Sequence, residues 1–192
     1  MEITFLGKNS FKFKTKTLTL VIDPISSKEK ADVVIYTTPQ AAHAGGQAGR
    51  FEISGAVNRE KTFVIDKEGE YELGGVGIIA DRVEIGKEGM VVRISGDGVE
   101  VAHTGALVGD PDEKMKQKLS EIDVLLVTLT GGAGLIDACE PYLAVLMGYD
   151  AIGEVDHFLS TNKFEVVKRD MDKLKLDADS LPESTEVVVL NG

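Results

Sequence analysis

Apolar and polar residues alternate along much of the chain with the period of two that is typical of β-strands. In FKFKT (11–15), Phe alternates with Lys, which predicts a strand with one buried face and one face in water. ADVVIYT (31–37) is apolar on both faces, which predicts an inner strand that is covered on both sides. The pattern predicts ten further strands: ITFLG (3–7), LTLVIDP (18–24), TFVID (62–66), GEYEL (69–73), VGIIADRVEI (76–85), MVVRIS (90–95), VEVAH (99–103), DVLLVTL (123–129), YLAVLMG (142–148) and TEVVVL (185–190).

Glycine-rich turns separate the strands predicted between residues 62 and 103, at KEG, GG, GKEG and GDG. Closely spaced strands with such turns favour an antiparallel meander. GGVGII (74–79) and GGAG (131–134) are not followed by the helix and Lys of a phosphate-binding loop. We therefore interpret both stretches as turns.

One helix is predicted over residues 111–122. Asp110 is a suitable N-cap, Pro111 suits the first helical position, and Glu113 stands where a capping-box acid belongs. The apolar stripe of this helix consists of Met115, Leu119 and Ile122. The alternation of predicted strands with a helix indicates an α/β or α+β domain, which we expect to span residues 1–192 as a single unit.

The charge of the chain restricts its partners. The formal net charge is −11, so the average surface repels the phosphates of nucleic acids and anionic lipids. We expect neither a nucleic-acid nor a membrane partner. The single cysteine, Cys139, excludes an internal disulfide framework, and MEITFLGKNSF has neither the basic start nor the apolar stretch of a signal peptide. These features predict a soluble, cytoplasmic protein.

Several segments occur in the order found in one family of enzymes. They are ITFLGKNSF, LVIDP, ADVVIYT, FVIDKEGEYELGGV, GVEVAHTGAL, DVLLVTLTGG, EPYLAVLMGY and the ending DKLKLDADSLPESTEVVVL. Together they resemble the small metal-dependent hydrolases of the metallo-β-lactamase superfamily. The resemblance implies a four-layer αββα sandwich, in which two mixed sheets lie face to face with helices outside.

The resemblance also indicates where the family's metal ligands should lie. They belong to an H-x-H-x-D-H motif after the strand ADVVIYT, a His after the strand following GEYELGGV, an Asp in H-x-G-D, and a last His before a Tyr. The stretch GIIADRVEIGKEG contains no His. The other six positions hold Thr38, Gln40, Ala42, His43, Ala106 and Gly148. Because zinc sites use three or four His, Cys or carboxylate ligands, we expect neither a bound metal nor another cofactor.

Other chemistry at the same place would depend on two histidines. His43 and His103, with Asp23, could hold one metal ion or act as acid and base. The competing interpretation makes His103 a buried structural residue and Asp23 the residue that orders a turn before Pro24. We expect His157 to lie on the surface and Cys139 to pack as a small apolar residue.

Compared with the family pattern, the sequence predicts a shorter connection between two strands, because IDACEPY leads almost directly to YLAVLMG. We expect a missing helix here, with apolar strand surface left bare near residues 143–147 and covered by a second copy. The sequence as a whole predicts a non-catalytic protein of this fold that acts in binding or assembly, with a small molecule or a protein as partner. The alternative is a metal-dependent hydrolase with a site rebuilt around His43 and His103.

Overall fold

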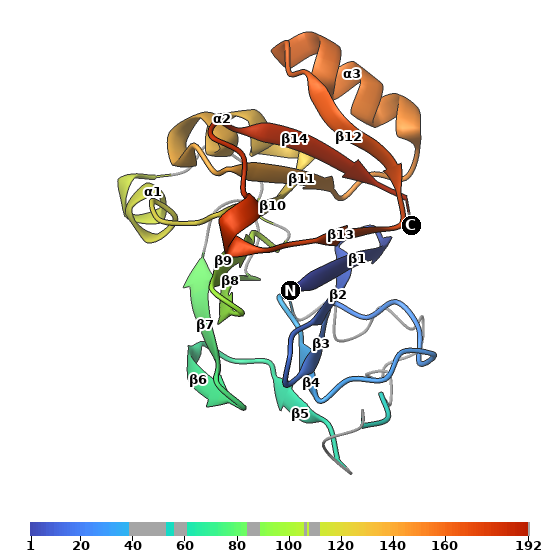
Figure 1. Ribbon diagram of the computed structural model, residues 1–192, viewed down its shortest axis with the longest axis vertical. Coiled ribbons are helices and arrows are strands. Elements are labelled where there is room, and N and C mark those ends of the chain that lie inside the picture. The colour runs from blue at the N-terminus through green and yellow to red at the C-terminus, as the bar shows by residue number, and fades with distance from the viewer. Residues whose placement is uncertain (39–52, 56–60, 84–88, 106, 108–111, 192) are drawn as a thin grey trace.

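The computed structural model describes residues 1–38, 53–55, 61–83, 89–105, 107 and 112–191. Two β-sheets lie face to face, and the helices gather on one side of them (Figure 1). Every strand that the hydrophobic pattern predicts is present. Two further strands, β12 (Val166–Met171) and β13 (Lys173–Lys175), and two helices, α2 (Leu129–Cys139) and α3 (Ile152–Asn162), were not predicted.

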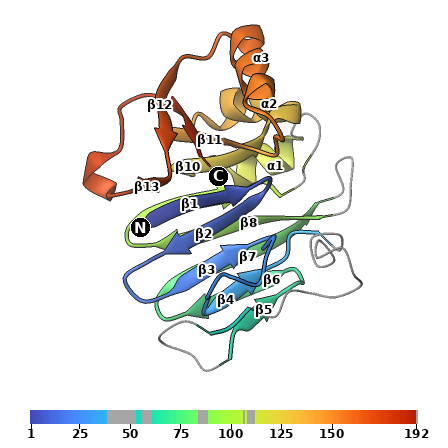
Figure 2. The same ribbon diagram turned by 90° about the vertical axis from the view of Figure 1, so that its right-hand side faces the viewer.

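The smaller sheet has six strands in the order β13-β1-β2-β3-β4-β5 (Figure 2). Apart from β13, its strands are β1 (Glu2–Gly7), β2 (Ser10–Lys14), β3 (Thr19–Ile22), β4 (Val33–Ile35) and β5 (Phe63–Ile65). The pairs β13–β1, β1–β2 and β2–β3 are antiparallel, whereas the pairs β3–β4 and β4–β5 are parallel. The segment TFVID thus belongs to this sheet and not to the predicted meander.

The larger sheet has eight strands in the order β12-β14-β11-β10-β9-β8-β7-β6. Apart from β12, its strands are β6 (Gly69–Leu73), β7 (Val76–Val83), β8 (Gly89–Gly96), β9 (Val99–His103), β10 (Val124–Thr128), β11 (Leu143–Met147) and β14 (Glu186–Leu190). Strands β6 to β9 form the predicted antiparallel meander. The pairs from β9 to β12 are all parallel.

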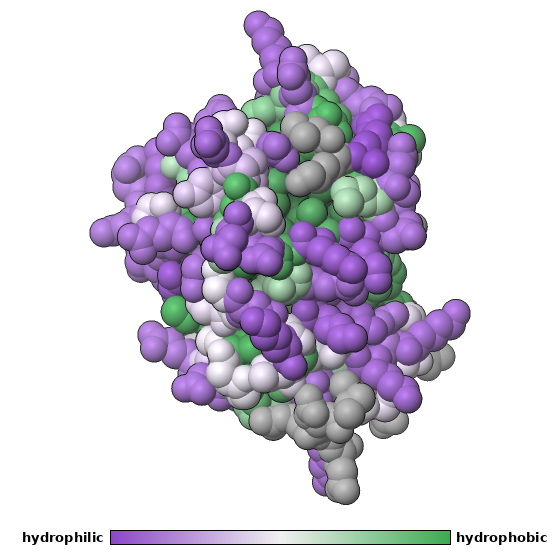
Figure 3. Space-filling view, viewed as in Figure 1, coloured by the Kyte–Doolittle hydropathy of each residue, from purple (hydrophilic) through white to green (hydrophobic). Residues whose placement is uncertain are grey.

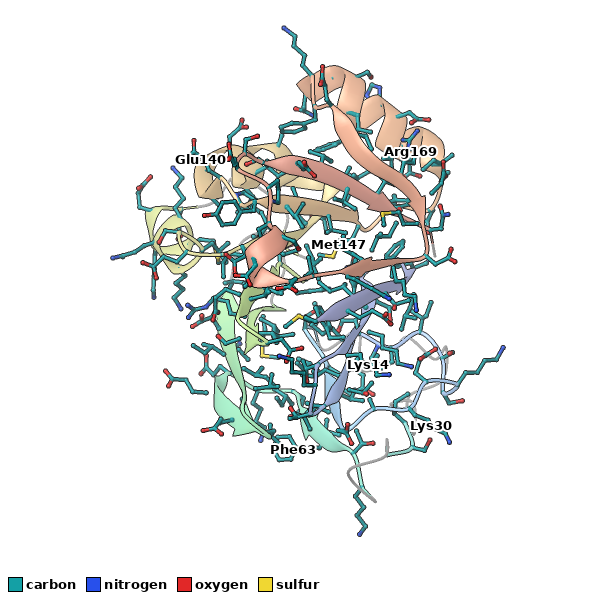
Figure 4. All side chains as sticks on the ribbon, viewed as in Figure 1. Lys14, Lys30, Phe63, Glu140, Met147 and Arg169 are labelled. Atoms are coloured by element: carbon teal, nitrogen blue, oxygen red, sulfur yellow. The ribbon has the colours of Figure 1, made fainter. Side chains whose placement is uncertain are left out.

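The main hydrophobic core fills the space between the sheets. It takes one apolar side chain from every second position, such as Phe11 and Phe13 on β2, while Lys12 and Lys14 point the other way. Met147, at the end of β11, is fully buried in this core (Figure 4). Hydrophilic side chains cover most of the face shown in Figure 3, as expected when both sheets turn their apolar faces inward.

A second core lies between the larger sheet and three helices, α1 (Glu113–Lys118), α2 (Leu129–Cys139) and α3. Helix α1 is the predicted helix, but it is shorter than expected. Its N-cap is Asp112, whose carboxylate accepts a hydrogen bond from the Met115 N–H. The predicted caps Asp110 and Pro111 lie outside the described residues. Leu119 and Ile122 are buried after the helix has ended, so the apolar stripe was identified correctly.

The prediction of a missing helix is wrong. Helix α2 occupies the place between β10 and β11, and it includes the GGAG stretch that we interpreted as a turn. The backbone is non-helical only at Thr130 and Gly131, where the helix is kinked. All five residues of β11 are buried, so this strand has no bare surface for a second copy to cover. The argument for a dimer through residues 143–147 is therefore wrong as well.

The outer face of the smaller sheet is covered by a small apolar cluster, whereas the three helices cover the larger sheet. Val21, Ala31, Val34 and Tyr36 form a small apolar cluster there, against which Leu6 and Ile53 pack. This cluster explains why ADVVIYT is apolar on both faces. Among the described residues, no helix is long and apolar enough to cross a membrane.

Candidate functional site

The predicted site lies at one edge of the sandwich, where strands of both sheets end. The parallel strands β9, β10 and β11 place their carboxyl ends side by side in the larger sheet. The turn between β1 and β2 reaches this edge from the smaller sheet, since the Lys8 carbonyl accepts a hydrogen bond of 2.8 Å from the Gly148 N–H. Asp23, Thr38, His103 and Gly148 are described here, whereas Gln40, Ala42, His43 and Ala106 lie outside the described residues.

His103 is fully buried at the end of β9, and both of its ring nitrogens are engaged. The Gly105 N–H donates to Nδ1 at 3.0 Å, so Nδ1 is the acceptor of the neutral ring. The other nitrogen, Nε2, therefore carries the proton and donates to the Asn9 carbonyl at 2.8 Å. Phe11 packs edge-on against the ring with centroids 5.7 Å apart. The structural interpretation of His103 agrees with this geometry.

Burial also keeps this imidazole uncharged. Removal from water lowers the pKa of His103 to about 4, although the hydrogen bond to the Asn9 carbonyl acts in the opposite direction. At neutral pH the ring is neutral, and each of its nitrogens has a backbone partner. It can neither ligate a metal nor take up a proton without losing one of these hydrogen bonds.

Asp23 follows β3 and fixes the end of β4. Its carboxylate accepts hydrogen bonds from the Thr37 N–H at 2.8 Å and from Thr37 Oγ1 at 2.5 Å. Its own N–H donates to the Ile35 carbonyl, and its backbone is left-handed, with φ of 45°. Burial raises the pKa of Asp23 to about 6, while the two bonds from Thr37 lower it. Asp23 thus holds the residue before Thr38, which is a larger role than ordering a turn before Pro24.

Thr37 in turn connects the smaller sheet to the larger one. Its carbonyl accepts a hydrogen bond of 2.7 Å from the Met90 N–H at the start of β8. A Cβ on Gly105 would lie 2.6 Å from the Met90 carbonyl oxygen and 3.1 Å from the Thr37 Cβ. Gly105 also has φ of 63°, so this position requires glycine for both reasons. The backbone segments at Thr37, Met90 and Gly105 therefore lie close together beside His103.

Gly148 stands where the family places its last histidine, and its side-chain position is occupied. A Cβ there would lie 3.0 Å from Asn9 Oδ1 and 3.1 Å from Thr128 Cγ2. The φ of Gly148 is 76°, a left-handed conformation that favours glycine. Thr128 uses its hydroxyl to donate to the Leu107 carbonyl at 3.0 Å. Protein atoms thus crowd the position that the Cβ of a histidine would occupy here.

The family model of the beta-lactamase superfamily domain matches residues 2–145, which is more than half of the chain. The chain belongs to the metallo-β-lactamase superfamily. No curated protein matches it.

Solved structures of this superfamily share the fold over nearly the whole chain. A protein of the superfamily from Thermotoga maritima, named as a Zn-dependent hydrolase, is 28% identical with a TM-score of 0.77, over 99% of this chain and 98% of that one. Igni18, a metallo hydrolase from Ignicoccus hospitalis, is 16% identical with a TM-score of 0.62, over 99% and 94%. An isothiocyanate hydrolase from Delia radicum gut bacteria is 11% identical with a TM-score of 0.68, over 93% and 100%. The predicted fold class is confirmed.

The described residues at this edge do not fit the metal ions of the superfamily. Within the described part of the chain, no three His, Cys, Asp or Glu side chains are grouped so that they could hold a metal ion. Thr38 offers a hydroxyl, which is a poor zinc ligand, and Gly148 offers no side chain. His103 is the one imidazole described here at the edge, and its nitrogens are already bonded to backbone groups.

The sequence pattern gave no sign of three polar residues that contact the predicted site positions or their neighbours. Asn9, Thr37 and Thr128 are polar residues that match no ligand position, and nothing in their spacing signals a contact. The turn sequence GKNS shows only that the chain reverses between two strands. The contacts of Asn9 with His103 and Gly148 join positions far apart in sequence, so only the fold brings them together.

The other two candidate residues lie where we expected them. Cys139 is buried at the end of α2 in the second core, and burial raises its pKa to about 11. Its thiol is therefore protonated at neutral pH and a poor nucleophile. His157 is exposed on α3.

Proposed function

We propose that this protein is a non-catalytic member of the metallo-β-lactamase superfamily that acts in binding or assembly. One observation carries the proposal: both ring nitrogens of His103 are held by backbone groups, at 3.0 Å from Gly105 and 2.8 Å from Asn9. Within the described part of the chain, the one imidazole at this edge is therefore part of the scaffold. It is not a free ligand or base.

The sequence supports the same proposal at the positions that the structure does not describe. Gln40, Ala42 and Ala106 stand where the superfamily places a histidine and two aspartates. Hydrolysis by these enzymes depends on a metal that lowers the pKa of a bound water. An amide and two methyl groups cannot replace the imidazole and carboxylates that hold such a metal.

The alternative, a hydrolase rebuilt around His43 and His103, has less support. His103 would have to release Asn9 and Gly105 before it could bind a metal, and buried groups left without a hydrogen bond typically cost about 1–3 kcal/mol each. We therefore do not assign to this chain the Zn-dependent hydrolase activity for which the relative from Thermotoga maritima is named.

Two further parts of the proposal concern the setting of the protein. We place it in the cytoplasm, because its one cysteine is buried as a thiol and no other cysteine is present to pair with it.

We also propose that it self-associates, although not through β11. Phe63 and Val64 on the edge strand β5 are 38% and 42% exposed and offer apolar surface for such a contact. Static light scattering over a wide concentration range tests this, and a constant monomer mass would contradict it.

Thermal unfolding with and without a chelator tests the loss of the metal site. A metal bound only to the folded state stabilises it by linkage, so its removal lowers the Tm. We expect EDTA to leave the Tm of the tag-free protein unchanged, and added zinc to leave it unchanged as well. A Tm that falls with EDTA and recovers with zinc would contradict the proposed function.

A further inference from the structure

The turn between β1 and β2 connects the two sheets at the superfamily site. Lys8 and Asn9 are adjacent in this turn, and their carbonyl oxygens accept hydrogen bonds from two strands of the larger sheet. The Gly148 N–H after β11 donates to Lys8 at 2.8 Å, and His103 Nε2 on β9 donates to Asn9 at 2.8 Å. Strand β10 lies between β9 and β11. The turn therefore holds together three neighbouring strand ends.

The turn has the backbone conformation that this position requires. Gly7 has φ of 105° and Lys8 has φ of 54°, so two successive residues take positive φ values. Such a tight reversal lets adjacent carbonyl groups point across to the other sheet. Each accepted hydrogen bond satisfies a backbone or ring N–H at the site edge that would otherwise need another partner.

The side chain of Asn9 fills the remaining space. Its Oδ1 atom is buried and has no hydrogen-bond partner among the described residues. It lies 3.0 Å from the place where a Cβ of residue 148 would be, closer than nearly all real Cβ contacts. A buried carbonyl oxygen without a donor is unfavourable, so the Asn9 side chain holds this place at some cost in stability.

We propose that the β1–β2 turn links the two sheets at this edge without an ion, with the Asn9 side chain acting as a plug against the Cβ position of residue 148. The inference deepens the proposed function and rests on it, since it explains how the edge stays ordered without an ion. It also makes Asn9 the residue that keeps larger side chains out of position 148.

A double-mutant cycle between Asn9 and Gly148 tests the plug. Gly148→Ala adds one methyl group against Asn9 Oδ1 and Thr128, and it also strains the backbone. Gly75→Ala is the matched control, because Gly75 has φ of 77° and a Cβ there meets nothing within 4 Å. The control measures the strain of a left-handed alanine alone, which should lower the Tm by about 2–8 °C.

We expect Gly148→Ala to lower the Tm clearly more than Gly75→Ala does. In the Asn9→Ala background, the effect of Gly148→Ala should shrink toward that of Gly75→Ala, with a remainder due to Thr128. Asn9→Ala should leave the effect of Gly75→Ala unchanged. Equal effects of Gly148→Ala in both backgrounds, or equal effects of Gly148→Ala and Gly75→Ala, would overturn the plug. Metal bound to the wild-type protein would contradict the proposed function, but the cycle would still report on the plug by itself.

Discussion

The Nε2 atom of His103 lies 2.8 Å from the carbonyl oxygen of Asn9, although 94 positions separate the two residues. This contact joins the last residue of β9 in the larger sheet to the β1–β2 turn of the smaller sheet. The ring is fully buried, and the same imidazole accepts a hydrogen bond from Gly105. His103 therefore stabilises the fold at the place where relatives of this fold would bind metal.

Replacement of His103 should destabilise the protein. His103→Ala removes two buried hydrogen bonds and leaves a cavity next to Phe11, so we expect a loss of about 3 kcal/mol in the free energy of unfolding. Urea denaturation measures this loss. The matched control is His157→Ala on the exposed face of α3, which should change stability by less than about 0.5 kcal/mol. A loss at His103 no larger than that at His157 would contradict the structural role.

Asp23 should make stability depend on pH in a direction unusual for a carboxylate. Its pKa rises from 3.8 to about 6 on folding because of burial, so the folded state favours the protonated acid. The contribution of Asp23 is thus most favourable below about pH 4 and is lost as the pH rises to about 6. The linked change is on the order of 3 kcal/mol. Asp23→Asn removes this titration.

The difference in unfolding free energy between Asp23→Asn and the wild type should therefore shift in favour of the variant as the pH rises from 4 to 7. His103 titrates in the same window with the opposite sign, because its lowered pKa makes acid destabilising between about pH 6.5 and 4. That effect is common to both proteins and cancels in the difference. A difference that stays constant across this range would show that Asp23 does not titrate as the structure indicates.

Restoring the superfamily ligands should fail while Asn9 is present. The repaired variant carries Thr38→His, Gln40→His, Ala42→Asp, Ala106→Asp and Gly148→His. The Cβ of a histidine at position 148 would lie 3.0 Å from Asn9 Oδ1. We therefore expect this variant to be less stable than the wild type and to bind zinc weakly. Adding Asn9→Ala should raise its zinc affinity at least about tenfold, a change of about 1.4 kcal/mol in binding. Isothermal titration with zinc compares the two, and equal affinities would contradict the prediction.

Much of the fold follows from short-range patterns, because strand periodicity depends on neighbouring residues. FKFKT and VEVAH bury the residues that alternation assigns to the core. Helix α2 could not be predicted in this way, since adjacent glycines have low helix propensity and favour turns. The missing side chain at Gly132 lets Val127 pack closely against the helix, since a Cβ at this position would lie 3.2 Å from Val127 Cγ2. Packing against β10 overrides the local preference.

The candidate site was predictable in part. The resemblance identifies Thr38 and Gly148 as ligand positions that hold no typical zinc ligand, because this follows from residue identity alone. It does not show which residues surround this edge, since Asn9 and Thr37 act through long-range contacts. The choice of Asp112 over Asp110 as the N-cap of α1 could not be predicted either. The two aspartates flank Pro111, and only the backbone geometry selects between them.

Metal content tests the central claim most directly. Protein purified without an affinity tag, incubated with zinc, iron or manganese at neutral pH and dialysed, is analysed by elemental mass spectrometry together with His43→Ala. The account predicts well below one metal ion per chain for both proteins, because the described edge offers no free imidazole or carboxylate set. One or two ions per wild-type chain, lost in His43→Ala, would contradict it.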